Sequence, residues 1–539
     1  MSNPIVRVNV STLVAPTPST QQKIGALISQ GGTTLAAGAK SLLTQLSDLT
    51  PLLNGASALA SITQSGGTAT ATLEGSGSDI SSGTYNGSTG LVTLTLASGL
   101  GIGPGDPINV TATGTGSVTS INGAFVAAAG SSGTTLTYFG PTGLTLTISG
   151  GEADAGLGLA NGSTFLTTIA GSTVLGYNGT FIATVTSAKT FTYAVPSGTA
   201  SPATGSPTFT LPGAAELLEM ATTFFAQGSG QGVYVLELGA GTFVAAIAAL
   251  STYITNNPNA FYSYLVPRGW DGVSSFLTLL ASFETDTSQT YFFITTTLAT
   301  YADYTSSMKC AITLIEAPGV STTEFSMAAV FWVTLNYAPS SSNRITPLNL
   351  AFLFGVTAYP AAGNSAQLAT LQAANVNYVG SAGIGNVSGT ILIGGNNMDG
   401  NPFNYWYSVD WVQINVMIAI TAALIAGSNN PANPIYYNQA GINALQQVAI
   451  SVMAQGLGAG LVLNPIKALT LSAVAWAAAL DADTFGSYTA INADPFPSYV
   501  TENPSDYNSG LYKGFSILYV PLRGFAQITF NVTVSQFAT

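Results

Sequence analysis

Apolar and polar residues alternate at both ends of the chain. Residues 4–14 and residues 524–534 each have the period of two that is typical of a β-strand. Neither segment has a second alternating run beside it in the sequence, so we expect each strand to pair with a distant partner or with another chain. The apolar residues assigned to these two strand arms are Ile5, Val6, Val8, Val10, Ile528, Phe530, Val532 and Val534.

A long stretch from residue 66 to residue 211 has the pattern of strands throughout. It is rich in Thr, Ser and Gly, and runs such as residues 91–96 alternate apolar and polar side chains. We therefore predict an all-β module inserted into the chain.

This module contains an internal repeat. Asn122-Gly-Ala-Phe125 followed by residues 135–138 returns as Asn178-Gly-Thr-Phe181 followed by residues 190–193, at offsets of 178 − 122 = 56 and 190 − 135 = 55 residues. Asn-Gly between alternating runs is typical of a type I′ hairpin, because both turn residues need positive φ. The repeat predicts two related β units with such turns.

Between residues 212 and 345, strands alternate with helices. The predicted strands cover residues 233–238, 261–266, 291–296 and 310–315. The predicted helices cover residues 214–226, 242–254, 274–283 and 324–334. Because the strands are apolar on both faces, this order predicts a parallel or mixed sheet covered by helices.

Apolar residues at helical spacing predict a helix over residues 441–456, with an uncharged polar side. Two apolar runs, residues 412–427 and 468–480, fall short of a membrane span: the first contains Gln413 and Asn415 and the second is too short. We expect both runs to be buried helices.

These patterns predict an α+β multidomain protein: an α/β core with a helix-covered mixed sheet, an inserted all-β module and extended β-strand arms at both ends. The predicted segments are an N-terminal strand arm (1–20), a first part of the core (21–65), the inserted module with its two repeats (66–211), the α/β core (212–345), a C-terminal core (346–523) and a C-terminal strand arm (524–539).

The chain carries unusually little charge. Ten basic and 22 acidic residues make up 6% of its 539 residues, for a formal net charge of −12, while 47% are hydrophobic. Ordinary soluble domains are roughly 25% charged. So uncharged a surface favours a protein that other proteins cover in an assembly.

Composition also excludes several kinds of chemistry. With no His and the single Cys310, the chain cannot build Ser-His-Asp or Cys-His catalytic groups, His-containing zinc sites, disulfides or all-Cys clusters. Ten scattered cations argue against nucleic-acid binding. Cys310 opens an apolar run, which predicts a buried strand thiol. We expect no enzyme activity, catalytic residue, metal or cofactor.

Three segments of the C-terminal half resemble the sheath proteins of contractile-tailed bacteriophages. They are Asn404-Tyr-Trp-Tyr-Ser-Val-Asp-Trp-Val-Gln413, Pro434-Ile-Tyr-Tyr-Asn-Gln-Ala-Gly-Ile442 and Met453-Ala-Gln-Gly-Leu-Gly-Ala-Gly-Leu461. In that family an aromatic-Asp-Trp helix is followed by a proline, a step that opens a second helix and a glycine-rich exit. The resemblance extends over roughly residues 320–535. The low charge departs from related sheaths, which carry more Lys and Glu.

The resemblance implies a structural subunit of stacked hexameric rings that form a helical sleeve around a tail tube and contract to drive the tube through a host envelope. Its implied partners are other copies of itself, the tail tube protein, and the baseplate and tail terminator proteins, without nucleic acid or membrane insertion. It places the protein in a virion tail assembled in the host cytoplasm, in keeping with a start that lacks the pattern of a secretory signal. The two arms are expected to add strands to sheets of neighbouring subunits.

Family architecture also makes residues 439–456, with the following residues 457–463, the expected tube-facing surface. The candidate tube-facing residues are Asn443, Gln446, Gln447, Ser451 and Gln455.

Two alternatives belong to other classes. A Gly/Thr-rich surface-array or adhesin protein would account for the low charge and the β repeats, but not for the α/β core. A tail-associated polysaccharide hydrolase would require a defined carboxylate pair, and the sequence singles out none.

Overall fold

The computed structural model divides the chain into two compact units. A core unit comprises residues Ile24–Asn336 and Leu350–Gly400, and a helical unit contains residues 21–23, 337–349 and 401–524. The residues that the structure describes are 21–54, 57–73, 77–99, 107–128, 130–131, 133–154, 164–187, 189–210, 212–239, 243–285, 288–304, 308–318, 324–340, 342–360, 364–384 and 387–524. Both predicted strand arms therefore lie outside the described residues, apart from Gly524.

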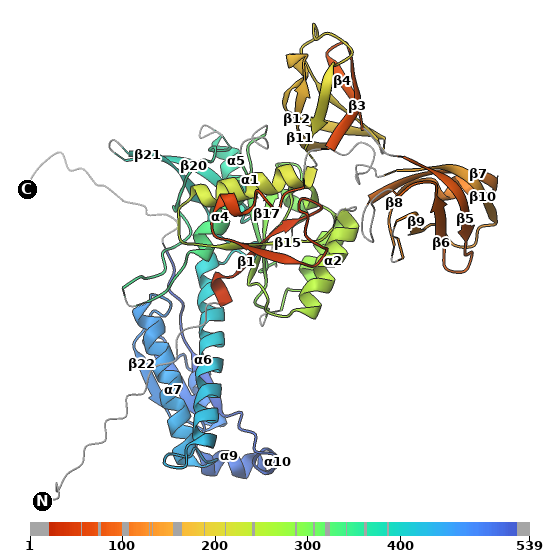
Figure 1. The fold of residues 1–539 in the computed structure, drawn as a ribbon. Coiled ribbons are helices and arrows are strands. Elements are labelled where there is room, and N and C mark those ends of the chain that lie inside the picture. Colours follow the sequence, from red (N-terminus) through yellow and green to blue (C-terminus); the bar gives the residue numbers. More distant parts are fainter. Residues whose placement is uncertain are drawn as a thin grey trace, which may run out of the picture. The chain divides into compact units, whose positions relative to one another are not determined.

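A nine-stranded mixed sheet forms the centre of the core unit (Figure 1). Its order is β19-β21-β20-β18-β17-β16-β1-β15-β2. The six strands from β20 to β15 are mutually parallel, and β2, β21 and β19 pair antiparallel at the edges. Their bounds are β1 Gly25–Ser29, β2 Lys40–Leu43, β15 Val233–Glu237, β16 Ser263–Leu265, β17 Tyr291–Thr296, β18 Ala311–Ile315, β19 Phe352–Leu353, β20 Asn377–Ile384 and β21 Val387–Ile393.

Helices cover this sheet, which confirms the predicted helix-covered mixed sheet. Phe292 and Phe293, neighbours on β17, point to opposite faces because side chains alternate along a strand. Phe292 lies 6.0 Å from the ring of Phe276, and Phe293 lies 4.9 Å from that of Phe331. The core helices are α1 Pro212–Ala226, α2 Phe243–Asn256, α3 Ser274–Ala281, α4 Ser326–Leu335 and α5 Ser365–Ala373, with 3₁₀ turns η2 Leu46–Asp48, η5 Arg268–Trp270 and η6 Tyr301–Asp303.

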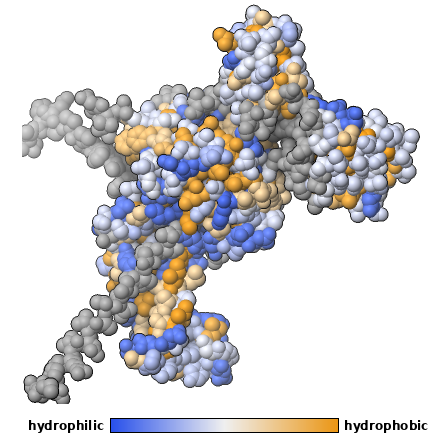
Figure 2. Space-filling view, viewed as in Figure 1, coloured by the Kyte–Doolittle hydropathy of each residue, from blue (hydrophilic) through white to orange (hydrophobic). Residues whose placement is uncertain are grey.

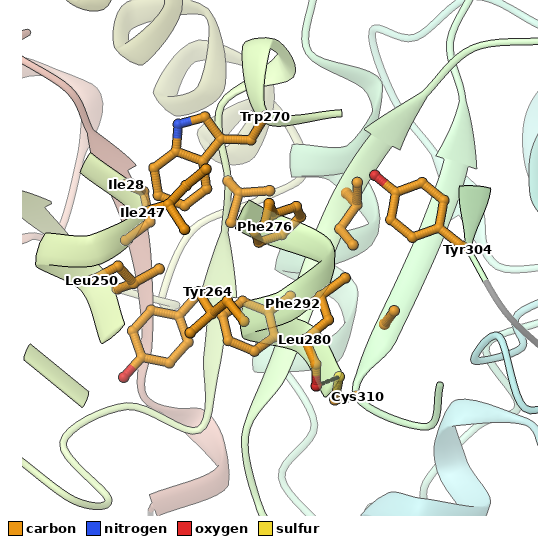
Figure 3. Close-up of a cluster of buried hydrophobic side chains, with 14 of the residues drawn as sticks. Ile28, Ile247, Leu250, Tyr264, Trp270, Phe276, Leu280, Phe292, Tyr304 and Cys310 are labelled. Atoms are coloured by element: carbon orange, nitrogen blue, oxygen red, sulfur yellow. Dashed lines mark hydrogen bonds between the residues drawn. The ribbon is translucent and has the colours of Figure 1, made fainter. Parts of the chain in front are cut away.

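A cluster of aromatic and aliphatic side chains fills the space between the sheet and α2 and α3 (Figure 3). Cys310 lies at its margin and is fully buried. Its thiol donates to the carbonyl oxygen of Leu280 at 3.4 Å and contacts a carboxylate oxygen of Glu284 at 2.9 Å. Burial raises the pKa of the Cys310 thiol. The predicted burial of the thiol is confirmed, but Cys310 lies in the turn that precedes β18 and not in the strand.

The inserted β region consists of two modules with the same topology. A closed barrel has the cyclic order β11-β12-β13-β4-β3-β14, and a half-barrel has the order β8-β7-β10-β5-β6-β9. The half-barrel strands follow the same succession as β12-β11-β14-β3-β4-β13 of the barrel. The strand bounds are β3 Ser57–Ser65, β4 Thr68–Leu73, β5 Ser78–Tyr85, β6 Leu91–Leu96, β7 Pro107–Gly116, β8 Gly123–Val126, β9 Thr135–Phe139, β10 Leu146–Asp154, β11 Thr164–Ser172, β12 Gly179–Ser187, β13 Thr190–Ala194 and β14 Gly205–Phe209.

The half-barrel is inserted into the sequence of the barrel: its strands lie between β4 and β11 in chain order. The β region also begins earlier than residue 66, since β3 pairs with β4 and β14 of the barrel. The two modules differ in closure. Strands β12 and β13 pair along four positions in the barrel, whereas an isolated bridge between Ala127 and Tyr138 stands at the equivalent place in the half-barrel.

The Asn-Gly repeat does not form type I′ turns, so that prediction was wrong. Asn122 and Asn178 end short 3₁₀ turns, η3 Val118–Ile121 and η4 Leu175–Tyr177, with negative φ of −95° and −81°. Each side chain instead bonds both backbone groups of one residue in a neighbouring strand: Asn122 those of Ala112 at 2.8 and 2.9 Å, and Asn178 those of Ser172 at 3.1 and 2.7 Å. The repeated Asn anchors a corner of each module.

The helical unit is built on two long helices, α6 Phe403–Asn429 and α7 Gln439–Gly458. Helix α7 contains the helix predicted over residues 441–456. A three-stranded sheet in the order β22-β23-β24 accompanies them, with β22 and β23 parallel and β24 antiparallel. The remaining elements are η1 Gln21–Lys23, β22 Ile466–Leu469, α8 Ala473–Asp481, β23 Thr489–Ala493, α9 Phe496–Glu502, α10 Pro504–Asn508 and β24 Phe515–Leu518.

Candidate assembly surface

The first half of α6 is anchored by aromatic residues at four-residue spacing. Phe403, Tyr407 and Trp411 are all buried, since residues four apart share a helix face. Polar side chains beside them bond backbone carbonyls: Ser408 donates to Leu461 at 2.8 Å and Asn404 donates to Leu522 at 3.0 Å. These contacts hold α6 against the chain that follows α7.

Glycines permit close contacts of α6 with α7 and with the segment that joins the two helices. A Cβ at Gly456 would lie 3.2 Å from the Trp411 ring, and one at Gly427 would lie 2.6 Å from Ile435. Helix α7 begins at an Asn cap, where the Asn438 side chain accepts the backbone N–H of Gly441 at 2.9 Å. The glycine-rich pattern of this region therefore serves close packing of the helices.

The second half of α6 exposes apolar side chains. Met417 and Ile425 are 61% and 60% exposed, and Ile418 and Leu424 are also on the surface. Apolar residues run along the part of the surface where Figure 1 places α6 (Figure 2). The helix predicted over residues 412–427 forms, but beyond Asn415 only Ala419 and Gly427 are buried, so the predicted burial is wrong for most of this half.

The run over residues 468–480 was also predicted to be a buried helix, and this is wrong too. It forms the end of β22 and then α8, which has no buried residue. Val474 is 74% exposed and Leu480 is also exposed. Leu463 and Tyr436 of the helical unit are exposed as well.

Six of the eight exposed apolar residues named below lie in a stretch of sequence without charge. Residues 411–466 contain no Asp, Glu, Lys or Arg, a run of 466 − 411 + 1 = 56 residues that includes most of α6 and all of α7. We call the exposed residues Met417, Ile418, Leu424, Ile425, Tyr436, Leu463, Val474 and Leu480 the apolar surface. Helix α6 is also long and apolar enough to cross a membrane, with one third of its most apolar window buried.

The residues predicted to face a tube lie on different sides of α7. Asn443, Gln447 and Ser451 are exposed, and Gln455 is half-buried. Gln446 is buried, and its amide nitrogen donates to the carbonyl oxygens of Leu469 at 2.7 Å and Ile491 at 2.8 Å. Gln446 therefore ties α7 to β22 and β23, and its side chain is unavailable to a partner.

A separate charged cluster lies in the core unit, and sequence patterns did not indicate it. Arg268 binds both carboxylate oxygens of Glu316, at 2.6 and 3.1 Å, and one oxygen of Glu219 at 2.9 Å. Its backbone N–H donates to Glu216 at 2.9 Å, and its guanidinium lies 4.1 Å from the centre of the Phe325 ring. The residues come from α1, from η5 after β16 and from the chain that follows β18, so only the folded sheet brings them together.

Burial governs the titration of this cluster. It raises the pKa of Glu219 to about 8 and also raises that of Glu216, with Arg268 opposing both shifts. Burial alone would lower the pKa of Arg268, but the three carboxylates raise it overall. The cluster joins α1 to the loops after two strands of the sheet. Among the described residues, no group of three or more His, Cys, Asp or Glu could hold a metal ion.

Comparisons with known proteins give matches among solved structures. No protein-family model matches the sequence, and no curated protein matches it. The structure is similar to the sheath tail protein Lin1278 from Listeria innocua, with 10% identity and a TM-score of 0.34, covering 82% of this chain and 86% of that one. It is also similar to the helical sheath of the anti-feeding prophage in its contracted state, with 14% identity and a TM-score of 0.35, covering 57% of this chain and 80% of that one. The chain thus has structural matches to phage and prophage tail sheath proteins over most of its length.

Proposed function

We propose that this protein is the subunit of a contractile tail sheath. Its copies stack as hexameric rings in a helical sleeve around a tail tube, and the sleeve contracts to drive the tube through a host envelope. The observation that carries the proposal is the set of exposed apolar side chains on α6, Met417, Ile418, Leu424 and Ile425, within a 56-residue stretch free of charge, because exposed apolar residues of this kind are typical of a surface that other subunits cover. The motif resemblance within residues 404–461 directs the proposal toward a sheath.

Strand exchange links the subunits in this proposal. Residues 4–13 and 524–534 each supply an alternating strand that adds to the sheet of a neighbour. The three-stranded sheet of the helical unit offers two receiving edges, β22 and β24. Backbone hydrogen bonds hold the added strand, and the alternating apolar residues set its register.

The uncharged polar residues of α7 provide the tube-facing contact. Asn443, Gln447 and Ser451 present amide and hydroxyl groups, with Gln455 at the margin. These groups contact the tail tube protein through neutral hydrogen bonds in place of ion pairs. Baseplate and tail terminator proteins contact the two ends of the sleeve, and the assembled protein resides in the virion tail.

Electron microscopy of the purified full chain, before and after mild acid or urea, tests the proposal. Hollow tubes of stacked rings are expected, and removal of residues 4–13 should abolish them. Normal tubes from the truncated chain would contradict strand exchange. Flat two-dimensional sheets would instead support a surface-array protein, and recovery of the protein with lipid vesicles would identify α6 as a membrane segment.

Substitutions of exposed apolar residues on α6 test whether these side chains contact other subunits. Met417→Lys and Ile425→Lys alter exposed side chains, so the isolated subunit should fold normally. Each change should reduce tube formation by about 10- to 100-fold. Burying one apolar side chain at an interface contributes about 1.5–3 kcal/mol of free energy, which corresponds to this range. Leu175→Lys, at an 80% exposed position in the barrel, is the matched control and should assemble normally. Unchanged assembly of both α6 variants would contradict the proposed interface.

A further inference from the structure

The carboxylate of Glu237 is buried at the carboxyl end of β15, next to β1 in the core sheet (Figure 1). In the parallel register of these strands, Glu237 lies opposite Ser29, the last residue of β1. Its side chain therefore reaches the loop that leads from β1 toward β2. Among the residues that the structure describes, no Lys or Arg side chain forms an ion pair with it. A buried carboxylate without a cation depends on hydrogen bonds to compensate for its lost hydration.

Five donors supply these hydrogen bonds. The backbone N–H groups of Gly31 and Gly239 donate to Oε1 at 2.8 and 2.7 Å. The N–H and the hydroxyl of Thr33 donate to Oε2 at 3.0 and 2.7 Å, and the hydroxyl of Ser29 donates to the same oxygen at 2.7 Å. Gly31 and Gly239 have positive φ of 69° and 86°, which glycine adopts without a steric penalty. Donors that converge in this way from a turning backbone form an anion site.

Both stems of the inserted β region attach to the loop at this site. In the stem before β3, the backbone N–H of Asn54 donates to the carbonyl oxygen of Gly32 at 3.0 Å, and its side-chain amide donates to that of Gly31 at 2.7 Å. The stem after β14 contacts the loop at Gly213. A Cβ at Gly32 would lie 2.5 Å from the carbonyl oxygen of Gly213, and a Cβ at Gly213 would overlap the carbonyl oxygen of Gln30. The chain thus enters and leaves the inserted region against the loop that the carboxylate holds.

We propose that residues 29–33 and Gly239 form an anion site whose ligand is the chain's own Glu237 carboxylate, and that this internal ligand fixes both stems of the inserted β region to the core sheet. Without the carboxylate, buried donors lose their acceptor, so the loop opens and releases the stems. In a chain that lacks this side chain, the site binds a small free carboxylate such as acetate. The site lies within the core unit and stands whether or not the protein forms a sheath.

Hydrogen exchange of the full-length Glu237→Ala variant tests the anion site. The amides of Thr34 and Asn54 join the loop to the first stem and should exchange at least about tenfold faster than in the wild type. Sodium acetate at about 100 mM should slow both amides again, since a ligand that binds only the folded state stabilises it. Acetamide has nearly the same shape without the charge and should not slow them. Amides of β17 in the core sheet and of β13 in the barrel should be unchanged throughout.

Asp79→Ala, which removes an exposed carboxylate, is the matched control and should exchange as the wild type does. Wild-type rates in Glu237→Ala would overturn the proposal. Equal slowing by acetate and acetamide would overturn it too, because it would indicate the filling of a cavity in place of the binding of an anion.

Thr33→Val provides a second measurement if Glu237→Ala does not fold. This variant keeps the carboxylate and the side-chain volume but removes one hydroxyl donor. The amides of Thr34 and Asn54 should then exchange about fivefold faster, the equivalent of one hydrogen bond. Unchanged rates at these two amides, or an equal acceleration at β13 and β17, would contradict a site that holds the stems.

Discussion

Three carboxyl groups share one guanidinium in the core unit, so the protonation of Glu219 affects stability. Its pKa in the folded state is about 8, against 4.5 for an unperturbed Glu. Between these values the folded state binds more protons than the unfolded state, so this group lowers the free energy of unfolding as pH rises from about 4.5 to 8. Above that range Glu219 is ionised in the folded state, and the full cost of burying its negative charge is present.

Replacing this group by a neutral isostere should remove the dependence. The Glu219→Gln variant should be more stable than the wild type above pH 8, by up to a few kcal/mol since one pKa unit corresponds to about 1.4 kcal/mol. Thermal unfolding of the core unit from pH 5 to pH 9, followed by circular dichroism, measures the effect. Asp79→Asn, at an exposed position, is the control. Parallel pH profiles of Glu219→Gln and the wild type would contradict the assigned titration.

The two anchoring asparagines predict matched local effects. Asn122→Ala leaves the backbone groups of Ala112 without their partner, and Asn178→Ala does the same to Ser172. Each change should destabilise its own module by about 1–3 kcal/mol, the cost of unsatisfied polar groups. Hydrogen exchange should show faster opening of the half-barrel in the first variant and of the barrel in the second. Faster exchange spread equally over both modules would be inconsistent with two separate anchors.

At the scale of elements, α7 has a structural side and a side available to partners. Adjacent residues separate them, because successive helix positions are turned by about 100°. Gln446 joins the helix to the three-stranded sheet, while Gln447 is exposed. Helix α6 is divided along its length instead, with an anchored first half and an exposed second half.

This arrangement makes a paired prediction for α7. Gln446→Ala should lower the free energy of unfolding of the helical unit by about 1–3 kcal/mol, since two buried carbonyl oxygens lose their donor. Gln447→Ala should leave stability unchanged and weaken binding to a tube if this side faces one. Denaturant unfolding compares the two variants. A destabilisation of Gln447→Ala as large as that of Gln446→Ala would show that exposure does not separate their roles.

At the scale of the whole molecule, the low charge determines how copies attract one another. Salt screens attraction between charged surfaces over a distance of about 10 Å at 0.1 M, but hardly affects contact between apolar side chains. Self-association should therefore change little as ionic strength rises from low to physiological values. Light scattering across a salt series measures this directly. Dissociation of assemblies at physiological salt would mean that the few charged residues dominate the interface.

The two modules also show how an all-β insertion can grow. The half-barrel repeats the strand order of the barrel and is placed between two of its strands, so the chain enters and leaves the inner module at one end of the outer one. Matching ring pairs support the relation: Phe125 and Tyr138 lie 4.5 Å apart, and Phe181 and Tyr193 lie 4.6 Å apart. The repeat seen in the sequence is thus a repeat of tertiary structure.

The sequence by itself determined the alternation of strands and helices in the core, the helix α7 and the burial of Cys310. These follow from local periodicity and from apolar runs, which the backbone expresses without reference to distant residues. The repeated Asn-Gly was also visible in the sequence, but the predicted type I′ turn was wrong. Each Asn side chain bonds the backbone of a strand residue six to ten positions earlier, and this contact replaces the local turn.

Only the tertiary structure decided which apolar runs are covered. Residues 412–427 were predicted to be a buried helix, yet Met417 and Ile425 are exposed because other described segments of the helical unit cover little of the second half of α6. The tertiary structure also decided that Gln446 is buried, that Arg268 contacts three glutamates and that Gly524 lies beside Pro347. Each of these depends on contacts between residues far apart in the chain, and the spacing of residues along a sequence carries no information about which distant surfaces meet.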